Sequence, residues 1–248
     1  MLRKDIVRMF RIWVQTFLPS VITSVLYFLI FGTLLGSRIG QMQGVDYMSF
    51  VVPGLVMLAI VTNAYANSSF TFFQSKFFMR SIDELLVSPM PPWLIIAGFV
   101  GGGVIRGVLV GALVLLISVF FTGLHLSIFN LLVILIFAIL TAVVFSLAGL
   151  VNGVYAKSID AINIVPTFVL TPLVYLGGVF YSIHSLPAIA QYVTYVNPIF
   201  YLINGFRYGF LGIVDIALSI SFAVLIGMIV ALVAINMYLI RTGLGLKQ

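Results

Sequence analysis

Long runs without a charged side chain constrain this chain more than any other feature. The first extends from Ile12 to Ser37, and comparable runs recur along the sequence. A helix needs about 20 mostly apolar residues to cross a hydrocarbon core about 30 Å thick. Soluble domains carry roughly 25% charged residues, whereas this chain has 7% charged and 62% hydrophobic residues. We therefore expect an all-α integral membrane protein.

We predict six transmembrane helices in a single domain that covers residues 1–248. Cutting the chain at its charges places the spans at about 17–36, 48–73, 93–121, 127–155, 161–181 and 216–240. The segment 184–212 is too polar for a lipid-facing helix and too apolar for a loop in water. We expect short external re-entrant helices there, whose backbone groups are shielded by protein.

The distribution of basic residues sets the orientation, because cytoplasmic loops collect Lys and Arg. With both termini in the cytoplasm, Arg106 lies within a span, and Arg38 and Arg207 lie outside. The other nine of the 12 basic residues then lie inside. Six spans with both termini in the cytoplasm therefore fit the sequence best.

Residues 1–15 carry an apolar stripe beside basic side chains. The stripe consists of Leu2, Ile6, Met9, Phe10 and Trp13, and the basic residues are Arg3, Lys4, Arg8 and Arg11. This pattern fits an interfacial helix on the anionic inner leaflet, although an ordinary basic flank of a span fits equally well. The apolar run that follows is longer than the roughly 7–15 residues of a signal peptide, so we expect the helix to be retained.

The loop between the second and third spans contains the string RSIDELLVSPMPP, residues 80–92. Ser81 and Glu84 match a capping box, which satisfies free amides at a helix start. Ile82, Leu85 and Leu86 then share one face, and the prolines that follow end the helix. We therefore expect a short amphipathic helix at 80–89 on the cytoplasmic side. It is either a solvated connector, whose acidic residues only cap, or a docking helix for a cytoplasmic partner.

Three residues within the predicted spans are candidates for a pathway through the membrane. Arg106 is a charge inside a span, which is costly unless it is paired or faces water. It could meet an anionic substrate, pair with helix-end carbonyls, or lie shallower than the predicted bounds. Pro166 and Pro172 should kink or break the fifth span, which suits a moving helix but also occurs in static bundles. The steps Gly103/Gly107 and Gly107/Gly111 predict close helix packing.

Several kinds of site are absent from the sequence. The spans contain no Asp, Glu or His at mid-depth, where such residues relay ions. No metalloprotease, hydrolase or P-loop motif occurs, and the absence of cysteine excludes disulfides and thiolate metal sites. We therefore expect no catalytic residue, no metal and no bound cofactor. The net charge of +6 comes from the flanks of spans, so we expect no nucleic-acid partner.

Several motifs together resemble the ABC-2 type transport permease family, over about residues 10–245. They are VPGL (52–55), TNAYAN (62–67), IDELLVSP (82–89), GGGVIRG (101–107), SLAGLVNGVYAK (146–157), VPTFVLTPLVYLGGVFYS (165–182) and NPIFYLINGFRYGFLG (197–212). The last block is the most specific. The resemblance implies an ABC-2 fold like that of type V exporters, in the bacterial inner membrane.

The resemblance also implies partners and site residues. It implies a half-transporter that forms a homodimer and pairs with two copies of a cytoplasmic ABC ATPase subunit. ATP and Mg would bind that subunit, and this chain would not be an enzyme. The implied coupling helix at 80–89 includes Ser81, Ile82, Asp83, Glu84, Leu85 and Leu86. The implied external re-entrant segment includes Tyr195, Asn197, Pro198, Tyr201, Gly205 and Arg207.

We therefore expect the permease subunit of an ATP-binding cassette exporter that moves an unidentified substrate. The alternative is a membrane scaffold that recruits a cytosolic partner without transport. Membrane lipids are the remaining expected partner.

Overall fold

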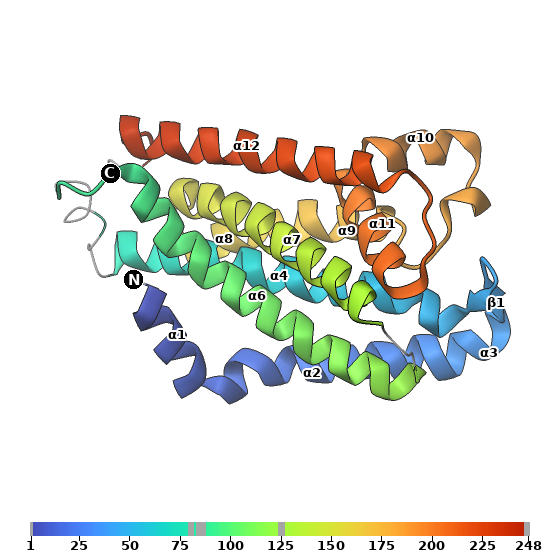
Figure 1. The fold of residues 1–248 in the computed structure, drawn as a ribbon. Coiled ribbons are helices and arrows are strands. Elements are labelled where there is room, and N and C mark those ends of the chain that lie inside the picture. Colours follow the sequence, from blue (N-terminus) through green and yellow to red (C-terminus); the bar gives the residue numbers. More distant parts are fainter. Residues whose placement is uncertain (1, 79–81, 83–87, 124–126, 246–248) are drawn as a thin grey trace.

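The computed structural model describes residues 2–78, 82, 88–123 and 127–245. Within these residues, six helical segments are long and apolar enough to cross a membrane, which confirms the predicted number of spans. Helix α1 (Leu2–Arg11) and the last turns of α12 (Leu218–Thr242) lie at one end of the bundle (Figure 1), which we call the terminal end. The opposite end carries strands β1 (Gln41–Met42) and β2 (Val45–Asp46), and we call it the hairpin end.

Of the six spans in the described residues, four are continuous α-helices, and the first and fifth contain π-helical turns. The first is α2 (Trp13–Phe28), which continues into the π-helical turn η1 (Leu29–Leu35) and α3 (Gly36–Ile39). The second, third and fourth are α4 (Tyr47–Phe77), α6 (Pro92–Thr122) and α7 (Ile128–Tyr155). The fifth is divided into α8 (Ile159–Val165), the π-helical turn η2 (Pro166–Leu170) and α9 (Thr171–Leu176). The 3-10 turn η3 (Ile183–Ser185), α10 (Ala188–Val196) and α11 (Pro198–Leu211) then precede α12, which is the sixth span.

Polar residues and glycines fix the ends of the spans. The side chains of Asp46, Ser127 and Ser158 accept hydrogen bonds from amides in the first turns of α4, α7 and α8. Such caps satisfy amide groups that have no partner within the helix. Gly123 and Gly243 end α6 and α12 with φ of 63° and 70°, a conformation that glycine adopts at little cost.

The fifth span is broken where its prolines predict a break. Pro166 begins the π-helical turn, and the Thr171 amide donates to the carbonyl of Pro166, five residues back. The Thr171 hydroxyl donates to the same carbonyl at 2.9 Å. The span ends at Leu176, before the predicted bound of 181, because Gly178 has a φ of 90° that no helix continues through.

Helix α4 forms the centre of the bundle. In its most apolar 18-residue window, 72% of the residues are buried, compared with 17% in the first span, 17% in the fifth and 11% in the sixth. Glycines on its neighbours allow close contact. A Cβ atom added at Gly107 of α6 would lie 2.8 Å from the Cβ of Ala64, and one added at Gly149 of α7 would overlap the carbonyl of Tyr65. The predicted close packing around Gly107 and Gly111 is therefore confirmed, and α4, α6 and α7 form a tight core.

A methyl group at Gly149 should loosen this core. We expect Gly149→Ala to lower the free energy of unfolding by about 1–3 kcal/mol, because the helices must separate to admit it. Gly227→Ala, on α12, is the matched control, since a Cβ there meets no atom within 4 Å. Alanine should leave stability unchanged there or raise it by about 0.5–1 kcal/mol. Thermal unfolding of both variants in detergent measures the difference, and equal stabilities would contradict the packing.

Helix α11 reaches deep into the bundle from the hairpin end. A Cβ at Gly209 would lie 2.7 Å from Ile134 of α7, and one at Gly205 would overlap the ring of Phe137. Pro198, at the start of α11, lines a groove together with Phe145. Helix α11 therefore runs beside the half of α7 nearer the hairpin end and begins near the middle of α7, the arrangement of a re-entrant helix. Its backbone is shielded by α4, α7 and α12 (Figure 1).

A buried ion pair holds the hairpin end together. The Arg207 and Asp215 side chains are 1% and 2% exposed, and Nη1 of Arg207 lies 2.6 Å from Oδ2 of Asp215. Arg207 also donates to the carbonyl of Gly178 at 2.8 Å and lies 4.2 Å from the ring centroid of Phe50 on α4. Oδ1 of Asp215 accepts from Gln43, beside the strand pair, at 3.1 Å. The pair thus connects α11 with α4, the end of the fifth span and the hairpin.

Removing one partner of this pair should unfold the hairpin end. We expect Arg207→Ala to cost about 3–5 kcal/mol, because the buried Asp215 carboxylate loses its arginine partner and keeps only Gln43 and the exposed His184 beside it. The double variant R207M/D215L replaces both charges with apolar side chains and should be more stable than R207A. A double variant that melts below R207A would show that the charges themselves are required.

Candidate functional site

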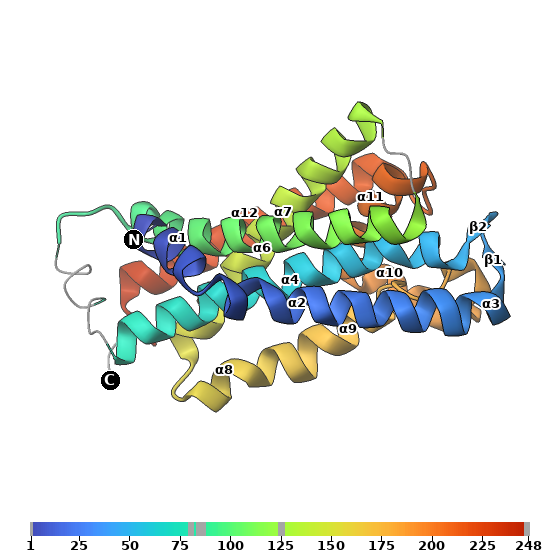
Figure 2. The ribbon, with the colours of Figure 1, turned by 90° about the horizontal axis from the view of Figure 1, so that it is seen from below.

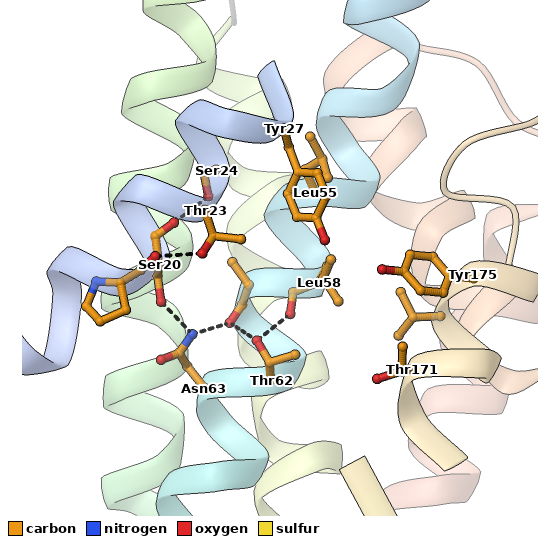
Figure 3. A pocket seen from close by; sticks show the side chains of 13 residues that line it. Ser20, Thr23, Ser24, Tyr27, Leu55, Leu58, Thr62, Asn63, Thr171 and Tyr175 are labelled. Atoms are coloured by element: carbon orange, nitrogen blue, oxygen red, sulfur yellow. Dashed lines mark hydrogen bonds between the residues drawn. The ribbon is translucent and has the colours of Figure 1, made fainter. Parts of the chain in front are cut away.

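A polar cleft of about 300 Å³ lies between α2, α4 and α9. Figure 3 shows its walls, with α2 and α4 side by side and α9 across from them. Its lining residues are Pro19, Ser20, Thr23, Ser24, Tyr27, Leu55, Leu58, Ala59, Thr62, Asn63, Thr171, Val174 and Tyr175. Because all three helices belong to membrane spans, hydroxyl and amide groups meet here at a depth where lipid would leave them unsatisfied.

The α2 wall is a stripe of hydroxyl groups. Ser20, Thr23, Ser24 and Tyr27 stand at spacings of three and four residues, which places them on one face of a helix. The Thr23 hydroxyl donates to the carbonyl of Pro19, and the Ser24 hydroxyl to that of Ser20, both at 2.8 Å. These bonds satisfy the hydrogens, so the hydroxyl oxygens remain as acceptors.

Asn63 joins the α4 wall to α2. Its Nδ2 donates to the Ser20 hydroxyl at 3.1 Å and to the carbonyl of Ala59 at 2.9 Å (Figure 3). Thr62, one residue earlier, donates to the carbonyl of Leu58 at 2.8 Å. The α2–α4 side of the cleft is therefore fixed by hydrogen bonds.

The third wall is held less firmly. Thr171, Val174 and Tyr175 come from the fifth span, whose most apolar window is only 17% buried. The hydroxyl groups of Tyr27 and Tyr175 point toward each other across the cleft (Figure 3). The lining contains no acidic, basic or histidine side chain. The cleft can therefore form hydrogen bonds with a solute and can widen at α9, but it has no group that relays protons.

The predicted pathway residues lie beside this cleft rather than in it. Nη1 of Arg106 donates to Oδ1 of Asn67 on α4 at 3.4 Å. Gly102, four residues earlier in α6, packs against Asp5 of α1. Arg106 therefore lies about 6 Å further along α6 from the terminal end than this contact with α1. Arg106 is the fifteenth of the 31 residues of α6, and its role in a pathway stays a prediction. Pro166 starts η2, and Pro172 is exposed next to the lining residue Thr171.

Asp5 is a buried residue that the sequence analysis missed. It lies 3.4 Å from Arg8, which also donates to Gln74 at 2.9 Å and Thr71 at 3.0 Å, both on α4. Burial raises the pKa of the Asp5 carboxyl, and the neighbouring Arg8 guanidinium opposes part of that rise. Met9, four residues later, is also buried. This helical spacing, which places Asp5 on the same face as Met9, could have predicted the burial of Asp5. The pair docks α1 on the core and leaves Arg3, Lys4 and Arg11 exposed.

The predicted coupling residues are largely outside the described residues. Ser81, Asp83, Glu84, Leu85 and Leu86 all fall there. Ile82 is described and is 1% exposed, in an apolar cluster with Phe72 of α4 and Phe99 of α6. Ile82 therefore packs against its own chain, whereas the expected docking face would turn it toward a partner.

The predicted external residues shape the re-entrant segment. Asn197 accepts from the amide of Ile199 at 3.0 Å and donates to the carbonyl of Leu173 in α9 at 2.6 Å. The Tyr201 hydroxyl donates to the carbonyl of Tyr195 at 2.9 Å. Helix α11 begins at Pro198 and contacts α7 at Gly205. Its Arg207 forms the ion pair with Asp215. None of these six residues lines the cleft.

Sequence reasoning also missed the cleft itself. The stripe from Ser20 to Tyr27 was visible as a spacing, and Thr62 and Asn63 stand in the TNAYAN string. Each pattern alone fits ordinary packing, since serine and threonine in a membrane helix often bond to their own backbone. The pairing of these faces with α9 is a property of the tertiary structure.

Water should enter this cleft, and the absence of cysteine makes the test direct. We expect a single cysteine at Thr62→Cys to react with a membrane-impermeant maleimide in proteoliposomes, because the hydroxyl-lined walls solvate the thiol. Leu116→Cys is the control, since Leu116 on α6 is 65% exposed on the lipid-facing surface and should stay unreacted. If neither cysteine reacts with the maleimide, water does not enter the cleft.

Comparisons with known proteins agree with this arrangement. A model of the family described as ABC-2 type transporter matches residues 1–211. The inner membrane transport permease YadH of Escherichia coli (strain K12) is 57% identical over 247 residues, which cover 99% of this chain and 94% of that protein. Nodulation protein J of Rhizobium leguminosarum bv. viciae is 24% identical over 204 residues, which cover 81% of this chain and 78% of that protein.

Proposed function

Because the chain belongs to the ABC-2 type transporter family, we propose that this inner-membrane transport permease is the membrane subunit of an ATP-driven exporter. Its substrate crosses through the cleft between α2, α4 and α9. The polar cleft within the spans is the observation that carries this proposal. A solute could form hydrogen bonds with the hydroxyl and amide groups that line this cleft within the spans.

The fifth span supports movement at the cleft. It forms one wall through Thr171 and Tyr175, it is interrupted by η2, and most of it is exposed. A wall that packs loosely can move without breaking the α4–α6–α7 core. In this proposal, displacement of α9 relative to α2 and α4 opens and closes the pathway.

The energy for export comes from a separate ATPase on the cytoplasmic side. The cleft lining has no acidic, basic or histidine side chain for an ion gradient to act on. Helix α4 ends and α6 begins at the terminal end (Figure 1), and the distribution of basic residues favours a cytoplasmic position for that end. Because Ile82 is buried, we assign partner contact to Leu85 and Leu86.

A second copy of the chain completes the pathway. The cleft is open at its side, and apolar residues next to its lining on α2 and α9 are exposed, with Leu26 at 52% and Leu176 at 50%. In the proposed homodimer, these rims face the partner copy and separate the polar lining from lipid. Each copy then binds one ATPase subunit.

Purification of the tagged chain from its native membranes in mild detergent tests the proposal. We expect a P-loop ATPase to co-purify, and the native mass of the complex to correspond to two copies of each protein. Leu85→Asp should insert and fold normally but lose the ATPase, because a carboxylate replaces an apolar contact.

Val214→Asp is the matched control for that variant. Val214 is 46% exposed at the hairpin end, far from the proposed contact, so the ATPase should remain bound. A stable wild-type permease that reproducibly lacks an ATPase would favour the scaffold alternative. If Leu85→Asp still binds the ATPase, Leu85 does not form the proposed contact.

A further inference from the structure

A second cavity, on the other side of the fifth span, is apolar. This groove of about 520 Å³ lies between α7, the fifth span and α12, and its exposed wall is almost entirely carbon. Phe145 and Val151 line it from α7, Val165 and Val169 from the fifth span, and Met228 and Leu232 from α12. Apolar cavities of about 150 Å³ stay free of water and accept hydrocarbon ligands. An empty groove would also forfeit the dispersion contacts of its walls.

The length of the groove matches one leaflet of a bilayer. Its α7 lining extends from Phe145 to Tyr155, the last residue of that helix. Ten residues at a rise of 1.5 Å cover about 15 Å, which is half of a hydrocarbon core about 30 Å thick. Pro198 and Ile199, where α11 begins near mid-depth, lie at the deep end. The groove therefore extends from the terminal end of the bundle to the middle of the membrane.

The mouth of the groove carries a net positive charge. Tyr155 is 56% exposed there, and Lys157 follows two residues later as an exposed cation. Where α7 ends, α8 begins and α12 ends, Lys157 and Arg241 outnumber the exposed Asp160 among the described residues. The Asn152 side chain is engaged in hydrogen bonds to Ser69 and to the carbonyl of Ile162. A cationic mouth above an apolar groove complements an anionic head group with an acyl chain.

We propose that the groove binds one acyl chain of an anionic phospholipid from the leaflet at the terminal end, with the phosphate near Lys157. The chain then lies against Val165, Val169 and Leu170, which belong to the π-helical turn and the residue before it. The fifth span, which η2 interrupts, is thereby supported on this side by lipid, which can rearrange, instead of by fixed side chains. This inference stands independently of any ATPase or substrate.

Photo-crosslinking in nanodiscs tests the site. The full chain is reconstituted with phosphatidylglycerol that carries a diazirine midway along one acyl chain, and the crosslinked residues are mapped by mass spectrometry. We expect crosslinks to concentrate on groove residues such as Phe145, Val169 and Met228. Lipid-facing residues outside the groove, such as Leu116 on α6, should be labelled only weakly.

Two variants separate the acyl chain from the head group. Ala231→Trp fills the groove from α12 and should abolish crosslinking there, whereas Leu116→Trp, on the surface of α6, should not. Lys157→Gln lies outside the spans and leaves the groove intact. It should remove the preference of the groove for phosphatidylglycerol over a phosphatidylcholine probe with the same diazirine.

Three results would overturn the proposal. Crosslinks spread evenly over all lipid-facing residues would mean ordinary contact with the bilayer. A groove that stays unlabelled in the wild-type protein would mean that a second copy of the chain covers it. If the phosphatidylglycerol and phosphatidylcholine probes label the groove equally, and Lys157→Gln does not change this, the groove does not select an anionic head group.

Discussion

Close contact between backbones holds this protein together, because lipid gives two apolar helices little reason to associate. Glycines at positions 107 and 149 bring α6 and α7 against α4. The result is a core of three helices to which the other spans attach more loosely, as their low burial indicates. Figure 2 shows the fifth span displaced from this core. The polar cleft and the apolar groove both border the fifth span, so each has one wall outside the tight core.

Polar groups are used in two different ways. Arg207 and Asp215 satisfy each other and fix the hairpin end, while Lys76 donates to the carbonyls of Val154 and Gly245 and fixes the ends of α4 and α7 at the terminal end. In the cleft, by contrast, Ser20 and Thr23 bond mainly within their own helix or to Asn63 and keep acceptor oxygens free. The first use fixes the two ends of the core. The second leaves a surface between them with which a solute can form hydrogen bonds.

Much of the fold could be predicted from the sequence, because charge-free runs and prolines act locally. The six spans and the break at Pro166 follow from this local chemistry. The site could not be predicted in the same way. Arg207 gave no indication that its partner would be Asp215, and the stripe from Ser20 to Tyr27 did not identify the helix opposite. Of the predicted apolar face at 80–89, Ile82 alone belongs to the described residues, and it faces the core, since the same spacing serves an inward or an outward contact.

The continuity of α4 and α6 has a mechanical consequence. Each contains 31 residues, a length of about 46 Å at a rise of 1.5 Å per residue, whereas the hydrocarbon core measures about 30 Å. Both helices belong to the tight core, and α4 ends and α6 begins at the terminal end (Figure 1). Under the proposed function, a force applied where α4 ends and α6 begins is transmitted through these two stiff helices to the core as a whole. We then expect the strain to concentrate at η2, in the loosely packed fifth span.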